Sequence, residues 1–140
     1  MSEAIVLDAS AVLALMDAEP GQEAVAAVLP GALVSAVNLA EVVSKLAERG
    51  MPAAQAHADA LALGIDVVAF DGDLALDVGA LRPLTRAAGL SLGDRCCLAL
   101  ARLYHAAVLT TEARWEPVAK AVDVTMQNIR PRPSRRRGGE

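Results

Sequence analysis

Aromatic side chains are scarce in this chain of 140 residues, which contains one Phe, one Tyr and one Trp. The interior must therefore be packed from aliphatic side chains and alanine, because these are the apolar types left to bury. A chain of this length is sufficient for one domain and can enclose a core of its own. No internal repeat divides the sequence, which excludes a repeat architecture.

Cysteines are equally few. The two that are present, Cys96 and Cys97, are adjacent in the chain. On a helix their side chains point in different directions, which argues against a disulfide between them, and their spacing does not match that of zinc ligands. We expect reduced thiols, buried or half-buried, in a cytosolic protein.

Long apolar runs are also absent. No uninterrupted apolar stretch reaches the length that spans a membrane. The first three residues, Met1 to Glu3, lack the basic segment that opens a signal peptide. We therefore expect a soluble, cytoplasmic protein without a membrane partner.

Charge is distributed unevenly. The formal net charge is −4, yet residues 129–140 contain five arginines and one glutamate, so residues 1–128 carry a net charge of −8. Such an acidic body is a poor general phosphate binder. It needs a metal ion, a local basic patch, the tail or a basic partner to approach RNA or DNA. The tail, rich in Pro, Arg, Ser and Gly, is predicted to be disordered; its arginines either bind RNA phosphates or only solubilise the chain end.

Strand-like apolar runs alternate with helical patterns along residues 1–128. This alternation predicts a single domain of the α/β class, with a central parallel sheet and helices on its faces. The expected strands are 4–7, 32–35, 66–70, 106–110 and, at the edge of the sheet, 122–128. The expected helices are 11–16, a short one after Pro20 and Gly21, 38–49, 52–64, one from Asp71 that ends before Pro83, a turn that ends at Gly89, 91–104 and 112–121.

Four carboxylates, those of Asp8, Glu41, Asp94 and Glu112, each stand at the start of an expected helix. Asp8 and Glu112 directly follow strand-like runs, so in a parallel sheet they leave it at the same edge, where ligands of open α/β sheets bind. Acidic side chains gathered there repel one another unless a cation lies between them. Hard oxygen ligands suit Mg²⁺ or Mn²⁺. The sequence therefore indicates a metal site that handles phosphates.

Each of these acids also has a structural interpretation as part of a helix cap. Asp8 can cap the first helix, and an acid in a first turn favours the helix dipole. Capping-box pairs are possible as well. The candidate caps are Asn38 with Glu41, Ser91 with Asp94, and Thr111 for the helix that Glu112 opens. Taken singly, each acid is better explained as part of a helix cap. Taken together, the four acids are better explained by a metal site.

The segments around the four acids resemble the four motifs of PIN-domain nucleases, and the closest match is to VapC-type toxins. The resemblance extends over about residues 4–128 in the family order. The four segments are residues 8–15 (DASAVLAL), 38–42 (NLAEV), 91–101 (SLGDRCCLALA) and 109–115 (LTTEARW). In the last segment the family usually has Asp where this chain has Glu112.

The resemblance implies an α/β/α sandwich around a parallel sheet and a metal-dependent endoribonuclease that cleaves RNA. It implies that Asp8, Glu41 and Asp94 are the core acids that bind Mg²⁺ or Mn²⁺ and activate water for phosphodiester hydrolysis; Glu112 matches by charge only. It also implies a cognate antitoxin that holds the enzyme inactive, and a homodimer. Many small apolar residues on the helices of 38–64 likewise predict an interface. The residues that can orient the metal ligands are Ser10, Asn38, Thr110 and Thr111.

Two alternatives remain open. A degenerate PIN-like module would bind RNA or a partner without cutting, and Glu112 is the feature that favours it. A phosphatase of the haloacid-dehalogenase type would use Asp8 as its nucleophile, but such enzymes carry a second Asp where this chain has Ser10. Arg95 and Arg114 flank two of the acids and either contact phosphate or are solvated and ion-paired.

Overall fold

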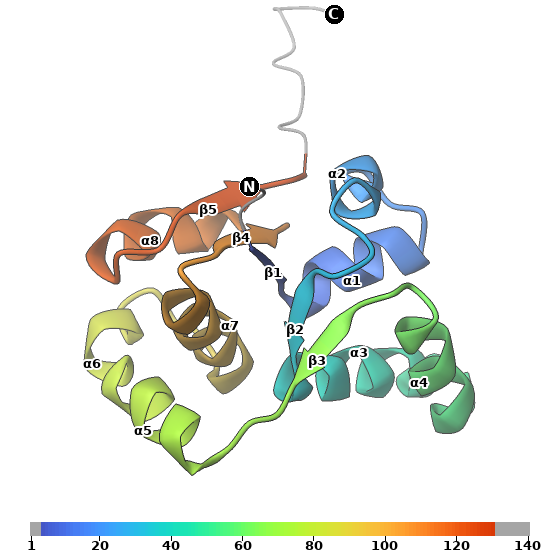
Figure 1. Cartoon of the computed structure of the whole chain (residues 1–140), viewed down its shortest axis with the longest axis horizontal. Helices are drawn as coiled ribbons and strands as arrows, with labels where there is room; N and C mark the ends of the chain where they lie inside the picture. Colours follow the sequence, from blue (N-terminus) through green and yellow to red (C-terminus); the bar gives the residue numbers. More distant parts are fainter. Residues whose placement is uncertain (1–3, 131–140) are drawn as a thin grey trace, which may run out of the picture.

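The computed structural model describes residues 4–130 as one parallel sheet with helices on both faces (Figure 1). The strands are β1 (Ile5–Leu7), β2 (Leu33–Ser35), β3 (Asp66–Val68), β4 (Ala107–Thr110) and β5 (Met126–Asn128). The helices are α1 (Ala9–Met16), α2 (Gln22–Ala26), α3 (Ala36–Glu48), α4 (Ala53–Leu61), α5 (Gly72–Ala80), α6 (Arg82–Thr85), α7 (Leu92–Tyr104) and α8 (Glu116–Ala121), and a 3-10 turn, η1 (Ala113–Trp115), precedes α8. The predicted fold class is confirmed.

The order of the strands creates a crevice at the centre of the sheet. All neighbours are parallel, in the order β3-β2-β1-β4-β5. The chain extends the sheet on one side of β1 through β2 and β3, and then crosses to β4 and β5 on the other side. The strand order therefore reverses between β1 and β4, where the register pairs Leu7 with Leu109. Ligands of open α/β sheets bind at such a switch point, beyond the carboxyl ends of the strands.

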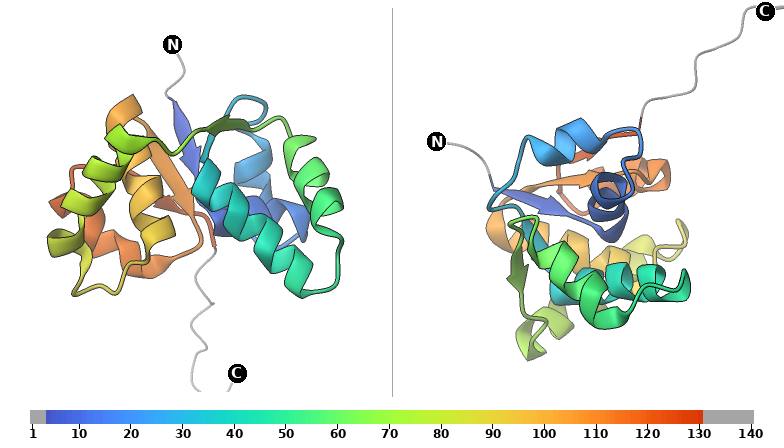
Figure 2. Two further views of the ribbon diagram at one scale, coloured as in Figure 1. Left: turned by 90° about the horizontal axis from the view of Figure 1, so that it is seen from below. Right: turned by 90° about the vertical axis from the view of Figure 1, so that its right-hand side faces the viewer.

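Alternate strand residues face two separate cores, because successive side chains of a strand point to opposite faces. Val6 and Val108 pack with α5, α7 and α8, whereas Leu7 and Leu109 pack with α1 to α4. Figure 2 shows these two groups of helices on opposite sides of the sheet. Fully buried Trp115 lies in the first core.

Helix α3 begins earlier than the sequence predicted, and this changes the role of Glu41. The hydroxyl of Ser35, the last residue of β2, accepts a hydrogen bond from the backbone N–H of Val37 at 3.2 Å and caps α3. This cap satisfies a free donor of the first turn, so the helix starts directly after the strand. Asn38 therefore lies inside α3 and Glu41 in its second turn. The predicted capping box of Asn38 and Glu41 is wrong.

The predicted helix 112–121 is divided. Glu112 precedes η1 without capping it through its side chain, and α8 starts only at Glu116 with a proline in its first turn. Proline has no N–H to donate and suits this first-turn position, which explains the late start. Thr111 makes no cap for a helix opened by Glu112, so that expectation is wrong. By contrast, the predicted capping box of Ser91 and Asp94 is present on α7.

The C-terminal end of the described range also bears on an expectation from the sequence. Ile129, counted with the tail on composition, is buried in the core of α1 to α4, and its N–H donates to the carbonyl of Thr110 at 2.9 Å. The other tail residues after Arg130 lie outside the described residues. Within residues 4–130, no helix combines the length and the apolar character needed to cross a membrane.

Candidate functional site

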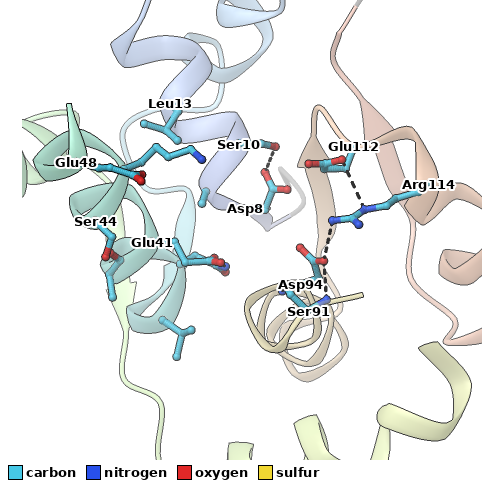
Figure 3. A pocket seen from close by; sticks show the side chains of 15 residues that line it. Asp8, Ser10, Leu13, Glu41, Ser44, Glu48, Ser91, Asp94, Glu112 and Arg114 are labelled. Carbon is cyan, nitrogen blue, oxygen red and sulfur yellow. Dashed lines mark hydrogen bonds and ion pairs between the residues drawn. The ribbon is translucent and has the colours of Figure 1, made fainter. Parts of the chain in front are cut away.

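One pocket at the carboxyl edge of the sheet brings the four predicted acids together, beside the switch point of β1 and β4. The pocket has a volume of about 570 Å³ and is lined by Asp8, Glu41, Asp94 and Glu112, among others. Asp8 follows β1, Glu41 lies on α3, Asp94 is in the first turn of α7, and Glu112 follows β4. Figure 3 shows their carboxylates directed toward a common space. Four segments that are distant in the sequence thus supply one acidic surface.

Asp8 is the most buried of these acids, with 3% of its surface exposed. Its Oδ1 accepts hydrogen bonds from the hydroxyl of Ser10 at 2.7 Å and from the backbone N–H of Ala11 at 2.9 Å. Its Oδ2 accepts from the hydroxyl of Thr110 at 2.6 Å. Asp8 therefore caps α1 and at the same time joins the ends of β1 and β4.

The two hydroxyls around Asp8 are themselves oriented by the loop after β4. Ser10 Oγ accepts from the N–H of Thr111 at 3.0 Å, and Thr110 Oγ1 accepts from the N–H of Glu112 at 3.0 Å. Because these backbone groups can only donate, the hydroxyl protons are left to point at Asp8. The predicted orienting role is thus present for the side chains of Ser10 and Thr110, whereas Thr111 contributes its backbone.

Burial raises the pKa of Asp8 to about 6, from an ordinary value of 3.8. Removal from water disfavours the charged carboxylate, and this effect exceeds the lowering by the hydrogen bonds from Thr110, Ser10 and Ala11. Nearby Asp94 adds a smaller increase through like-charge repulsion. The ionised form of Asp8 therefore lacks a compensating positive charge, and a bound cation would supply one.

Glu41 is held against the first turn of α7. Asn38 Nδ2 donates to Glu41 Oε1 at 2.8 Å and also to the carbonyl of Gly93 at 3.0 Å, so one buried amide joins α3 to α7. A Cβ at Gly93 would overlap the carboxylate of Glu41. Glycine at this position is therefore what allows Glu41 to reach the neighbourhood of Asp94. Sequence reasoning assigned no role to Gly93.

Asp94 and Glu112 share a basic neighbour. Asp94 Oδ2 accepts from the backbone N–H of Ser91 at 2.9 Å, which completes the capping box. The guanidinium of Arg114 lies 3.4 Å from Asp94 Oδ2 and 3.6 Å from Glu112 Oε2. Of the two arginines singled out in the sequence, Arg114 reaches the acids. Arg95 instead donates to the carbonyl of Val78 at 3.1 Å and so ties α7 to α5.

The donor set of the pocket suits a divalent ion in its chemistry but not yet in its geometry. The four acids offer oxygen atoms only, which suits Mg²⁺ or Mn²⁺, and the desolvated carboxylate of Asp8 favours a nearby positive charge. Within residues 4–130, however, no three His, Cys, Asp or Glu side chains lie close enough to form a ready metal site. The chemistry of the pocket fits a hard cation, and binding one requires these carboxylates to draw closer together.

Helix α3 contributes more residues to the pocket than the sequence pattern predicted. Lys45 and Glu48 line it along with Glu41. They follow Glu41 by four and seven residues, a spacing that returns to the same face of a helix. This periodicity was the signal that could have identified them. The pocket is therefore not uniformly acidic, since Lys45 and Arg114 also line it.

Comparison with known proteins places this geometry in context. The sequence model of the PIN domain matches residues 5–121, and no curated protein matches the chain. Among solved structures, VapBC-1 from nontypeable Haemophilus influenzae is similar with a TM-score of 0.68 and 19% identity, over 90% of this chain and 98% of that one. VapBC2 from Rickettsia felis, bound to a promoter DNA fragment, has a TM-score of 0.67 and 14% identity, over 89% and 97%. A toxin–antitoxin complex from Klebsiella pneumoniae has a TM-score of 0.64 and 21% identity, over 80% and 90%. At these identities, the structural similarity shows a shared fold.

The raised pKa of Asp8 predicts a pH-dependent effect of the substitution Asp8→Asn on metal-free stability. Between about pH 4 and pH 6 the folded protein retains a proton that the unfolded chain releases, so the contribution of Asp8 to stability falls as the pH rises through this window. With about 1.4 kcal/mol for each pKa unit, the penalty at pH 7 is about 3 kcal/mol. The measurement is urea denaturation with a chelator present. The free energy of unfolding of Asp8→Asn, relative to that of the native protein, should rise by about 2–3 kcal/mol from pH 4 to pH 7.

The variant Asp66→Asn, at an exposed position on β3, controls for the loss of one negative charge. A difference between Asp8→Asn and the native protein that stays constant from pH 4 to pH 7 would show that Asp8 is ionised normally in the folded state.

The close approach of Gly93 and Glu41 predicts that substitutions at the two positions are coupled. Gly93→Ala should displace the flexible end of Glu41 and leave the fold intact, because the overlapping atoms belong to a side-chain terminus. In a double-mutant cycle with Glu41→Ala, urea denaturation should give a coupling free energy of about 1 kcal/mol, since residues in contact are not additive. The cost of Gly93→Ala should disappear when Glu41 is already truncated. If the effects of Gly93→Ala and Glu41→Ala on the free energy of unfolding are additive, the two residues are not in contact in solution.

Proposed function

Because this chain belongs to the PIN domain family, whose members are generally nucleases, we propose that it is a metal-dependent endoribonuclease of the VapC toxin class. The observation that carries the proposal is the meeting of Asp8, Glu41, Asp94 and Glu112 in one pocket at the switch point of the sheet. Ligands of this fold class bind at that position. The order and location of the four acids are those that the resemblance to PIN nucleases implies.

Phosphodiester hydrolysis requires neutralisation of the phosphate charge and activation of a water molecule, and one or two divalent ions supply both when bound. Asp8, Glu41 and Asp94 would hold Mg²⁺ or Mn²⁺. Glu112, which matches the family motif only in its negative charge, would join them. The extra methylene of Glu112 gives it a longer reach than the Asp that is usual in the family. Neighbouring polar side chains orient two of these acids: Ser10 and Thr110 fix Asp8, and Asn38 fixes Glu41.

The proposed substrate is RNA, which would approach a pocket whose lining includes the cations Lys45 and Arg114. These two cations would offset the repulsion between a phosphate backbone and an acidic body. The proposed partner is a cognate antitoxin, supported by the similarity to VapBC and other toxin–antitoxin structures. A basic partner suits a body with a net charge of −8. The proposed location is the cytoplasm, where such a toxin would meet its RNA target.

The second candidate function is a PIN-like module that binds RNA or a protein partner without cutting. Two observations favour it: Glu112 replaces the usual Asp, and Arg114 pairs with both Asp94 and Glu112. The haloacid-dehalogenase alternative has no comparable support. Its second Asp is replaced by Ser10, whose hydroxyl donates to Asp8, and the chain belongs to another family.

Substitution of the acids should separate the catalytic from the non-catalytic function. Loss of even an indirect partner of a metal ligand costs about 10- to 100-fold, so Asp8→Asn, Glu41→Gln and Asp94→Asn should each lower kcat/KM for RNA cleavage by at least about 100-fold. Glu112→Gln should cost less, about 10-fold, because its match is by charge only. The measurement is cleavage of a labelled RNA in Mg²⁺ or Mn²⁺, with a chelator as the blank.

Asp77→Asn, which changes an acid on α5 remote from the acidic pocket, is the matched control and should cleave normally. If the native protein binds RNA without cutting it under any divalent ion, the non-catalytic module is the correct function. Cleavage that persists in Asp8→Asn with unchanged metal dependence would remove Asp8 from the site.

The proposed homodimer is testable on the isolated protein. Large apolar side chains are exposed on several helices, including Leu76, Leu84, Leu103 and Tyr104, and exposed apolar surface can mark an interface. Light scattering coupled to size exclusion should give twice the mass of the 14.5 kDa chain. A protein that remains monomeric at high micromolar concentration would contradict the dimer.

A further inference from the structure

Arg114 brings a positive charge into the acidic pocket from within the chain. Its guanidinium lies between Asp94 of α7 and Glu112 of the loop after β4, and Figure 3 shows dashed ion pairs to both. The two acids come from separate elements and belong to the proposed metal-binding set. Arg114 therefore neutralises, in the metal-free protein, part of the charge that a divalent ion would neutralise in the bound state.

The ion pairs of Arg114 with Asp94 and Glu112 are weak enough for another cation to replace the guanidinium. Both distances exceed 3.3 Å, and 49% of the Arg114 side chain is exposed to solvent. Exposed ion pairs of this geometry are weak, because water competes for both partners. The backbone beside it is by contrast fixed, since the next residue, Trp115, is fully buried. A long side chain on a fixed backbone can leave the acids without any rearrangement of the fold.

A divalent ion bound by Asp94 and Glu112 would meet the guanidinium as a competitor. The same carboxylate oxygens cannot give their full charge to both cations, and two cations close together repel each other.

We infer that Arg114 is an internal counter-ion that competes with the divalent ion for Asp94 and Glu112, so that metal binding requires its displacement. This inference rests on the proposed function and adds a regulatory step to the same pocket. The displaced guanidinium would remain at the rim of the pocket, because its backbone is anchored by Trp115. Arg114 is thus a positioning residue for two acids in the metal-free state and sets the concentration of metal at which the site fills.

The test is Mn²⁺ binding measured by calorimetry on the full chain, with no RNA present. Two exposed ion pairs of ordinary strength correspond to about a 3- to 10-fold change in an equilibrium constant, so Arg114→Gln should bind Mn²⁺ about 3- to 10-fold more tightly than the native protein. Arg114→Lys, which retains the charge, should bind with nearly native affinity. Thermal unfolding with a chelator should show Arg114→Gln to be slightly less stable than the native protein, because Asp94 and Glu112 lose their counter-ion.

Arg49→Gln is the matched control. Arg49 is similarly exposed, at 52%, and forms an ion pair with Asp17 at 2.7 Å, outside the set of residues that line the pocket. The substitution Arg49→Gln changes the net charge by the same amount as Arg114→Gln and should leave the Mn²⁺ affinity unchanged.

The outcomes are distinct for the two proposals. Equal Mn²⁺ affinity of the native protein and Arg114→Gln would overturn the counter-ion inference and leave the proposed metal-dependent function standing. An equal gain in Arg49→Gln would overturn the inference as well, since the effect would then be one of overall charge. If neither the native protein nor Arg114→Gln binds Mn²⁺, the proposed metal dependence fails and the inference fails with it.

Discussion

The carboxylate of Asp8 is buried where two central strands end, and the arrangement around it follows from that burial. A charged group removed from water needs hydrogen bonds or a counter-charge, and Asp8 obtains three hydrogen bonds, from Ser10, Ala11 and Thr110. The hydroxyls of Ser10 and Thr110 in turn receive the N–H groups of Thr111 and Glu112. The need to satisfy one carboxylate thereby fixes the start of α1 and the loop after β4.

A second junction ties the two layers of helices at the same edge of the sheet. Helices α3 and α7 belong to different cores, and Asn38 links them through its bonds to Glu41 and to the carbonyl of Gly93. A Cβ at Gly93 would displace the carboxylate of Glu41 from its place beside the first turn of α7. The approach of the two helices thus depends on a polar contact as well as on apolar packing, and it determines how near Glu41 lies to Asp94.

The charges of the pocket are arranged so that it is partly neutralised from within. Asp8 has no positive neighbour among its hydrogen-bond partners, which accords with its raised pKa. Asp94 and Glu112 instead face Arg114. The pocket therefore combines one strongly desolvated acid with two acids that are already paired. Such a site favours a bound cation beside Asp8, and it already holds a competing positive charge, that of Arg114, beside Asp94 and Glu112.

The sequence by itself determined the class of fold and indicated the four acids that meet in the pocket, because the alternation of strands and helices and the placement of acids near expected helix starts are local patterns. The capping box of Ser91 and Asp94 was predictable for the same reason. Only the tertiary structure decided the start of α3 at Ser35, the proximity of Gly93 to Glu41, and the pairing of Arg114 with two acids. These features join segments that are far apart in the chain, and the distances between such segments depend on how helices pack on the sheet, which no local pattern encodes.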